Sequence, residues 1–201
     1  MHMRFAFQLS ENMKRAIRDR INSALGRIDL ERYSQEPAYV TALISRLDGV
    51  VYDGPDGRVE IKGTIVEDRG AHSAESLWGA DFAITAALTV GQHSVEKGIL
   101  GQAKKKSMHE LNLLQDYELR GQCSKMLAAT DHCIVLGLPK TKSLALLVRL
   151  VGEPLDVPME FQEYILERFL PCYHGDMRMS FVRAIQDSKL KRLHFKIMSR
   201  E

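Results

Sequence analysis

The sequence predicts an α/β fold in which helices flank a central mixed sheet. Apolar residues recur at helical intervals in the N-terminal quarter and again in a long later segment, and alternating apolar and polar residues mark strands between them. The elements follow the order helix, three strands, helix, strand, which favours a layered sandwich over a repeated strand–helix–strand unit. The 201 residues suit a single domain.

Two amphipathic helices are expected first. The second of them begins at Glu36-Pro37, because a proline at the first helical position lacks only an N–H that would be unpaired there. The apolar stripe of the first helix is Met13, Ile17, Ile21, Ala24 and Ile28, and that of the second is Val40, Leu43, Ile44 and Leu47.

A turn cluster at 53–57 precedes the first predicted strand, in which Val59, Ile61 and Ile65 alternate with polar residues. A polar connection (67–79) follows. The remaining predicted elements are strands from Asp81 to about Val90 and from about Gly98 to Lys104, a helix at 109–129, strands at 133–138 and 144–151, and a helix at 158–170. The basic C-terminal tail, which contains Lys189, Lys191, Arg192 and Lys196, is interpreted as ordinary surface.

Composition narrows the function classes. Hydrophobic residues make up 45% and charged residues 27%, and the net charge is +2. No apolar run is long enough for a membrane span. We therefore expect a cytoplasmic protein without a membrane partner. The three cysteines are sparse and are read as reduced thiols. The pairs His132-Cys133 and Cys172/His174 lack zinc-type spacing, and no phosphate-binding glycine loop is present.

The most informative residues are Asp81, Gln102 and Lys104. Alternation along a strand points Gln102 and Lys104 to the same face, and a hairpin would bring Asp81 beside them. Carboxylate and carbonyl oxygens bind hard cations such as Mg²⁺, and such a cation activates water for attack on a phosphodiester. The lysine would orient that water or neutralise charge on the phosphoryl group.

Gly79-Ala80-Asp81 followed by Gln102-Ala103-Lys104 resembles the PD-(D/E)XK restriction-endonuclease-like superfamily, in particular the Mrr-like branch in which glutamine replaces the acid. The similarity covers about 36–138. Further matches to small nuclease domains of bacterial anti-phage defence systems are Arg69-Gly70, Ser73-Ala74-Glu75, and Gln122-Cys123 with Met126. The resemblance implies one nuclease-like domain over 1–201, with a restriction-endonuclease-like core, extra N- and C-terminal helices, and a C-terminal elaboration over about 139–201.

The resemblance also implies a function and a larger set of site residues. The expected activity is a Mg²⁺- or Mn²⁺-dependent endonuclease acting on DNA, gated by oligomerisation or by a defence-system partner protein. Glu36 and Glu75 are the candidates that would join Asp81 and Gln102 in holding the metal. Lys105, Lys106 and Arg69 are the candidates for contacts with DNA phosphates.

Alternative interpretations remain open for these residues. Asp81 would also serve as the cap of a turn, and Gln102 and Lys104 as a polar strand edge. Glu36 is favoured at a helix N-terminus by the macrodipole alone, and Glu75 would be an ordinary surface residue. The alternative functions are a catalytically silent nuclease-fold subunit that binds DNA or a protein partner, and a ribonuclease.

Overall fold

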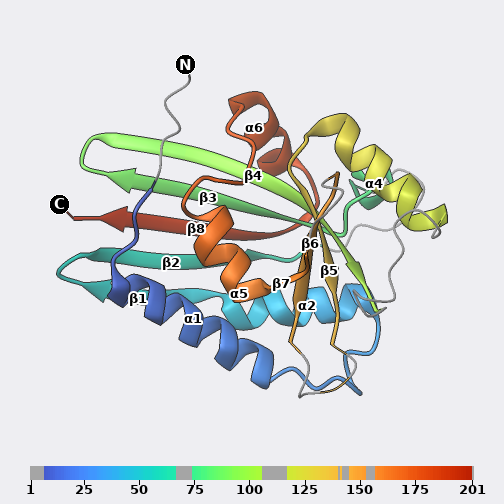
Figure 1. The fold of residues 1–201 in the computed structure, drawn as a ribbon, viewed down its shortest axis with the longest axis horizontal. Helices are drawn as coiled ribbons and strands as arrows, with labels where there is room; N and C mark the ends of the chain where they lie inside the picture. The colour runs from blue at the N-terminus through green and yellow to red at the C-terminus, as the bar shows by residue number, and fades with distance from the viewer. Residues whose placement is uncertain are drawn as a thin grey trace.

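The computed structural model describes residues 7–66, 74–105, 117–139, 141, 145–152 and 157–200. Its centre is one eight-stranded mixed sheet in the order β1-β2-β8-β3-β4-β5-β6-β7 (Figure 1). The predicted α/β class, with a mixed sheet between helices, is therefore confirmed. Within the described part of the chain, no helix is long and apolar enough to cross a bilayer.

The strands are β1 (Gly49–Gly54), β2 (Gly57–Thr64), β3 (Phe82–Val90), β4 (His93–Lys104), β5 (Cys133–Gly137), β6 (Leu147–Leu150), β7 (Met159–Glu160) and β8 (Lys191–Ser199). The helices are α1 (Glu11–Gly26), α2 (Glu36–Leu47), α3 (Ala74–Trp78), α4 (Tyr117–Ala129), α5 (Phe161–Tyr164) with the π-helical turn η1 (Ile165–Phe169), and α6 (Met179–Asp187).

Both N-terminal helices form as predicted. The Ser10 hydroxyl caps α1 by accepting a hydrogen bond from the Met13 amide at 3.2 Å, which satisfies one of the unpaired donors of the first turn. Pro37 lies in the first turn of α2. The predicted apolar stripes of both helices are buried.

The hairpin of β3 and β4 is the centre of the sheet. The two strands pair antiparallel with Phe82 opposite Gly101, and β4 then pairs in parallel with β5 after the crossover through α4. β4 begins at His93, five residues before the predicted start at Gly98, because residues 93–97 pair with residues 86–90 of β3. The sequence analysis missed β1, which takes in Asp53 and Gly54 of the predicted turn cluster, and it missed α6.

The interpretation of the C-terminal tail as ordinary surface is wrong. Residues 191–199 form β8, which lies between β2 and β3, antiparallel to the first and parallel to the second. Leu193, Phe195 and Ile197 are buried, since one face of this strand covers the core. The segment expected to be a C-terminal elaboration therefore supplies an interior strand of the sheet.

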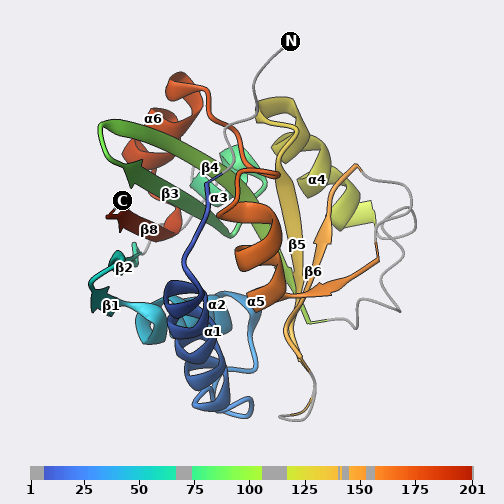
Figure 2. The same cartoon turned by 60° about the vertical axis from the view of Figure 1, so that its left-hand side comes forward.

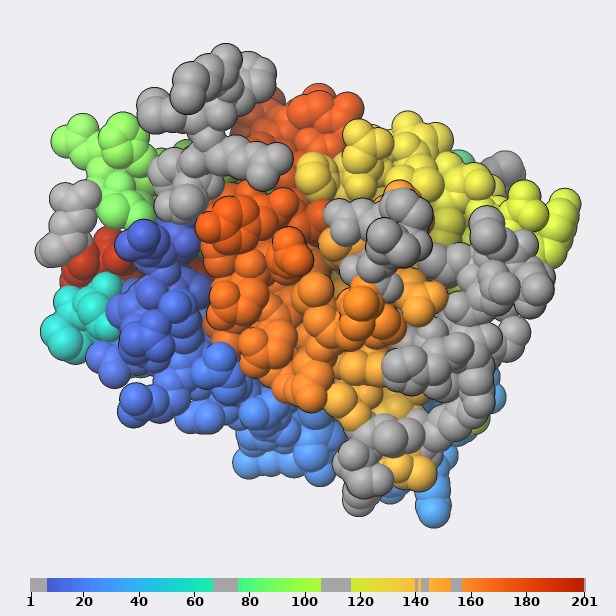
Figure 3. Space-filling view, in the orientation of Figure 1, coloured from blue at the N-terminus to red at the C-terminus, as the bar shows by residue number. Residues whose placement is uncertain are grey.

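Helices cover both faces of the sheet (Figure 2). One core lies between the sheet and α1, α2 and α5–η1, and a second, smaller core lies between the sheet and α4 and α6. On the first face, α1 and α5–η1 pack side by side (Figure 3), and an Arg18–Glu163 ion pair of 3.6 Å joins them. Alternate residues of β3, β4 and β8 therefore point to different cores.

A buried polar cluster lies under η1. The fully buried Lys97 ammonium donates hydrogen bonds to the carbonyl oxygens of Phe169 and His174, and burial lowers its pKa to about 8. Burial also lowers the pKa of His174 to about 3 and raises that of Tyr164. The tyrosine is therefore the donor in the 2.7 Å contact between its hydroxyl and His174 Nδ1.

We predict that Phe195→Ala destabilises the protein by about 3–5 kcal/mol, because it opens a cavity in the larger core. Met198→Ala, three residues along the same strand, is the control. Its side chain is 39% exposed, so we expect a change within about 0.5 kcal/mol. Urea denaturation measures both variants, and equal effects would contradict the interior position of β8.

His174 is predicted to make stability depend on pH. The unfolded histidine gains a proton as pH falls below 6.5, whereas the buried one stays neutral until about pH 3. Its stabilising contribution is therefore complete above pH 6.5 and is lost towards pH 3. Between pH 6 and 4, wild type should lose about 1.4 kcal/mol more per pH unit than His174→Gln. Urea denaturation at several pH values measures the slopes. Equal slopes for His174→Gln and wild type would refute the assignment.

Candidate active site

Asp81 enters the sheet directly before β3. Gly79 has a φ of +68°, a conformation that glycine adopts at little cost and that turns the chain from α3 towards the strand. The Asp81 amide then donates to the Gly101 carbonyl oxygen at 2.9 Å and extends the β3–β4 ladder by one residue. The loop packs so closely on α4 that a Cβ at Gly79 would lie 2.6 Å from the Gln122 carbonyl oxygen.

Asp81 and Gln102 contact each other below the surface. The carboxylate oxygen Oδ2 of Asp81 accepts hydrogen bonds from Gln102 Nε2 and from the Ala103 amide, both at 2.7 Å. Asp81 is 7% exposed and Gln102 1% exposed. The hairpin therefore brings the aspartate and the glutamine together, as the sequence analysis expected.

The other end of the Gln102 amide lacks a partner. Its carbonyl oxygen Oε1 is buried, and no group in the described part of the chain donates a hydrogen bond to it. A buried polar atom without a partner costs about 1–3 kcal/mol. Since the Nε2 contact with Asp81 fixes the orientation of the amide, Oε1 is held in place as an oxygen donor with unused lone pairs.

Lys104 and Glu36 meet at the C-terminal end of β4. The Lys104 ammonium lies 3.9 Å from Glu36 Oε2, and the Lys105 amide donates to Glu36 Oε1 at 2.7 Å. The Lys104 side chain is 11% exposed and that of Glu36 31% exposed. Glu36 is the first residue of α2, so this helix delivers a carboxylate to the end of the strand that carries Gln102 and Lys104.

The remaining predicted site residues are Glu75, Arg69, Lys106 and Lys105. Glu75 belongs to the short helix α3, but its side chain lies outside the described residues, as do Arg69 and Lys106 entirely. Lys105 is described and exposed, next to Lys104. The roles proposed for these four residues remain predictions.

The donor set fits a hard divalent cation. Asp81 and the Gln102 amide offer oxygen atoms, the ligand type that Mg²⁺ prefers, and Glu36 offers a further carboxylate at the end of β4. No group of three or more His, Cys, Asp or Glu residues that could hold a metal occurs among the described ranges. A cation here would therefore depend on the Gln102 oxygen, with waters completing its shell.

Lys191 lies at the same end of the sheet as Asp81, but the sequence analysis interpreted it as ordinary surface. It begins β8 in register with Phe82, one residue after Asp81, and its ammonium donates to the Pro37 carbonyl oxygen at 3.3 Å. The alternation of Leu193, Phe195 and Ile197 with polar residues is the signal that would have identified the strand.

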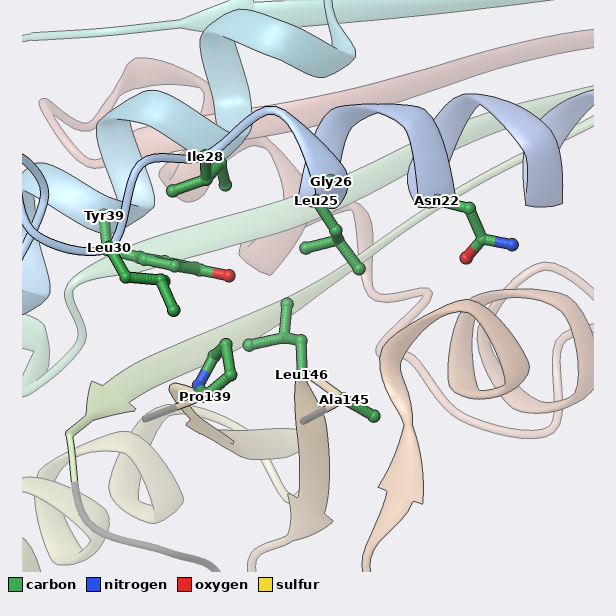
Figure 4. Close-up of a pocket in the computed structure, with 9 residues that line it drawn as sticks. All are labelled: Asn22, Leu25, Gly26, Ile28, Leu30, Tyr39, Pro139, Ala145 and Leu146. Atoms are coloured by element: carbon green, nitrogen blue, oxygen red, sulfur yellow. The ribbon is translucent and has the colours of Figure 1, made fainter. Parts of the chain in front are cut away.

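Two pockets lie elsewhere, and neither is lined by Asp81, Gln102, Lys104 or Glu36. One of about 210 Å³ is mainly apolar, and Figure 4 shows Tyr39 and Leu146 facing each other across it. The other, of about 330 Å³, is polar and includes Asp176, whose carboxylate accepts hydrogen bonds from Thr130 and Arg178. This ion-paired network connects β4 to the start of β5, so we interpret its role as structural.

Comparisons of the chain with protein-family models, curated proteins and solved structures found no match. The assignment of function therefore depends on the geometry described above and on the resemblance carried by the two short motifs.

We predict that Gly79→Ala destabilises the protein by at least about 1–2 kcal/mol, because alanine is strained at a φ of +68° and its Cβ would collide with α4. Gly121→Ala is the matched control. No atom lies within 4 Å of a Cβ at this position of α4, so alanine should stabilise the helix by about 0.5–1 kcal/mol. Thermal and urea denaturation give both values, and a neutral Gly79→Ala would contradict the close packing.

Proposed function

We propose that this protein is a divalent-metal-dependent nuclease that hydrolyses DNA phosphodiester bonds. The observation that carries the proposal is the buried Gln102 Oε1, which has no partner among the described residues and is oriented by Asp81, two residues before Lys104. The Gln102 oxygen held in this way could coordinate a cation, and the Lys104 ammonium could contact a phosphate. The resemblance of the Asp81 and Gln102-x-Lys104 motifs to PD-(D/E)XK nucleases agrees with this chemistry.

Asp81, Gln102 and Glu36 would hold the metal, with Glu75 as a further candidate. A bound Mg²⁺ or Mn²⁺ would polarise the phosphoryl group and lower the pKa of the attacking water. Glu36 now accepts from the Lys105 amide and faces Lys104, so a change of its rotamer would exchange these contacts for the cation. Its place in the first turn of α2 stabilises the carboxylate through the helix macrodipole.

Lys104 would act on the substrate. Its 3.9 Å separation from Glu36 Oε2 is longer than a hydrogen bond, so the ion pair leaves its N–H donors available for a water or a phosphoryl oxygen. The side chain is largely shielded from solvent, and a positive charge in such a setting stabilises developing negative charge more strongly than one in water.

The second candidate function is a nuclease-fold subunit that binds DNA or a protein partner without cutting. It is favoured by the neutral Gln102 in place of an acid, because the glutamine that contacts Asp81 contributes no negative charge to a cation site. A ribonuclease is the third candidate, on the same chemistry. The resemblance to defence nucleases favours invading DNA as the target, with activity gated by oligomerisation or by a partner.

We predict that Asp81→Asn and Lys104→Met each reduce metal-dependent cleavage at least about 10²–10³-fold, because each removes a charge that acts on the transition state. Lys62→Met is the control for Lys104→Met, since Lys62 is a solvent-exposed lysine of β2. Plasmid nicking with Mg²⁺ or Mn²⁺ measures the rates, and circular dichroism checks the fold. Undiminished cutting by the purified Lys104 variant would refute the assignment.

The same proteins separate the three candidates. Calorimetry with Mn²⁺ should show binding that Asp81→Asn abolishes, whereas an inert scaffold would show no heat that depends on Asp81. Parallel digestion of plasmid, single-stranded DNA and RNA then identifies the substrate, and cleavage confined to RNA would replace the DNA assignment.

A further inference from the structure

The first residue of β8 lies at the same end of the sheet as the candidate site. Lys191 pairs in register with Phe82, and Asp81 precedes Phe82 directly. Neighbouring strands are about 4.8 Å apart and successive Cα atoms 3.8 Å apart, so the Cα atoms of Lys191 and Asp81 are separated by less than about 9 Å. The chain thus brings a lysine from its C-terminal region close to Asp81.

The side chain of Lys191 extends towards α2. Residues paired in register share a face, and the next pair on this face, Leu193 and Ile84, belongs to the core beneath α1 and α2. The contact of its ammonium with the Pro37 carbonyl oxygen agrees with this direction. Pro37 follows Glu36, which faces Lys104. Two lysines from different strands therefore meet the first turn of one helix.

The ammonium of Lys191 retains donors for a ligand. Among the described residues it forms no ion pair within 4.0 Å, and one of its three donors is used by the Pro37 carbonyl oxygen. Its neighbour Arg192 differs, because that guanidinium donates to the Ile185 and Gln186 carbonyl oxygens and caps α6. Lys191 is partly exposed, so its remaining donors face solvent at the rim of the site.

We propose that Lys191 binds a DNA backbone phosphate next to the one to be cleaved, so that the strand crosses the end of the sheet over the first turn of α2. This inference rests on the proposed nuclease function and adds a path for its substrate. Asp81 and Gln102 lie on the α4 side of the sheet and Lys191 on the α2 side. A DNA strand held between Lys104 and Lys191 passes over the end of β3, where it can contact residues on both faces of the sheet.

The test is the salt dependence of duplex binding, measured by fluorescence anisotropy in the Asp81→Asn background so that cleavage does not interfere. Each phosphate contact adds about 0.9 to the slope of log Kobs against log salt. Lys191→Ala should lower that slope by about 0.9 and weaken binding equally for unrelated sequences. Lys191→Arg should keep the slope of the parent.

Lys196→Ala is the matched control, because Lys196 is exposed on the same strand, about 16 Å from Lys191. Its slope should equal that of the parent. The inference is wrong if Lys191→Ala lowers the slope no more than Lys196→Ala does, or if it lowers only the thermal midpoint. Lys191 would then only hold α2 in place through the Pro37 carbonyl oxygen, and the proposed nuclease function would be unaffected. If the parent shows no salt-dependent binding and wild type cuts no DNA, both fail together.

Discussion

The pair of hydrogen bonds accepted by Asp81 Oδ2 organises the candidate site. They connect the start of β3 to Gln102 and Ala103 near the end of β4, and they leave the Gln102 carbonyl oxygen buried with no donor among the described residues. A buried carboxylate is stable only when such donors compensate its lost hydration. The same contacts that stabilise Asp81 therefore fix the amide oxygen that would bind a cation, so stability and proposed chemistry depend on one short network.

Glu36 and Lys191 show that the site is assembled from distant parts of the chain. α2 brings the carboxylate to Lys104 and Lys105, and β8 brings a lysine to the carbonyl of Pro37. The first turn of α2 is thus in contact with both the middle and the C-terminal region of the sequence. Lys104 and Lys191 therefore lie at the same turn of α2, where a phosphate chain would meet both positive charges.

The sequence predicted the features that depend on local patterns and missed those that depend on long-range pairing. Local periodicity was sufficient for α1, α2 and the β3–β4 hairpin, and strand alternation together with the hairpin was sufficient to place Gln102 beside Asp81. Lys104, which was expected beside them, contacts Glu36 of α2. β8 was missed because its lysines and arginine dominated its composition, although Leu193, Phe195 and Ile197 alternate as a strand requires. Its position between β2 and β3 is a long-range pairing that local patterns do not encode. The donation from Lys191 to Pro37 follows from that pairing and was equally out of reach.

The interior position of β8 also sets an order of events during translation. β2 and β3 are synthesised well before residues 191–199, yet each forms hydrogen bonds with β8 and not with the other. A nascent chain that lacks these residues has two separate sheet fragments with unpaired edges, and closing the gap requires contacts of high sequence separation, which form slowly. The edge of β3 next to Asp81 therefore stays without its strand partner until residues 191–199 have been synthesised.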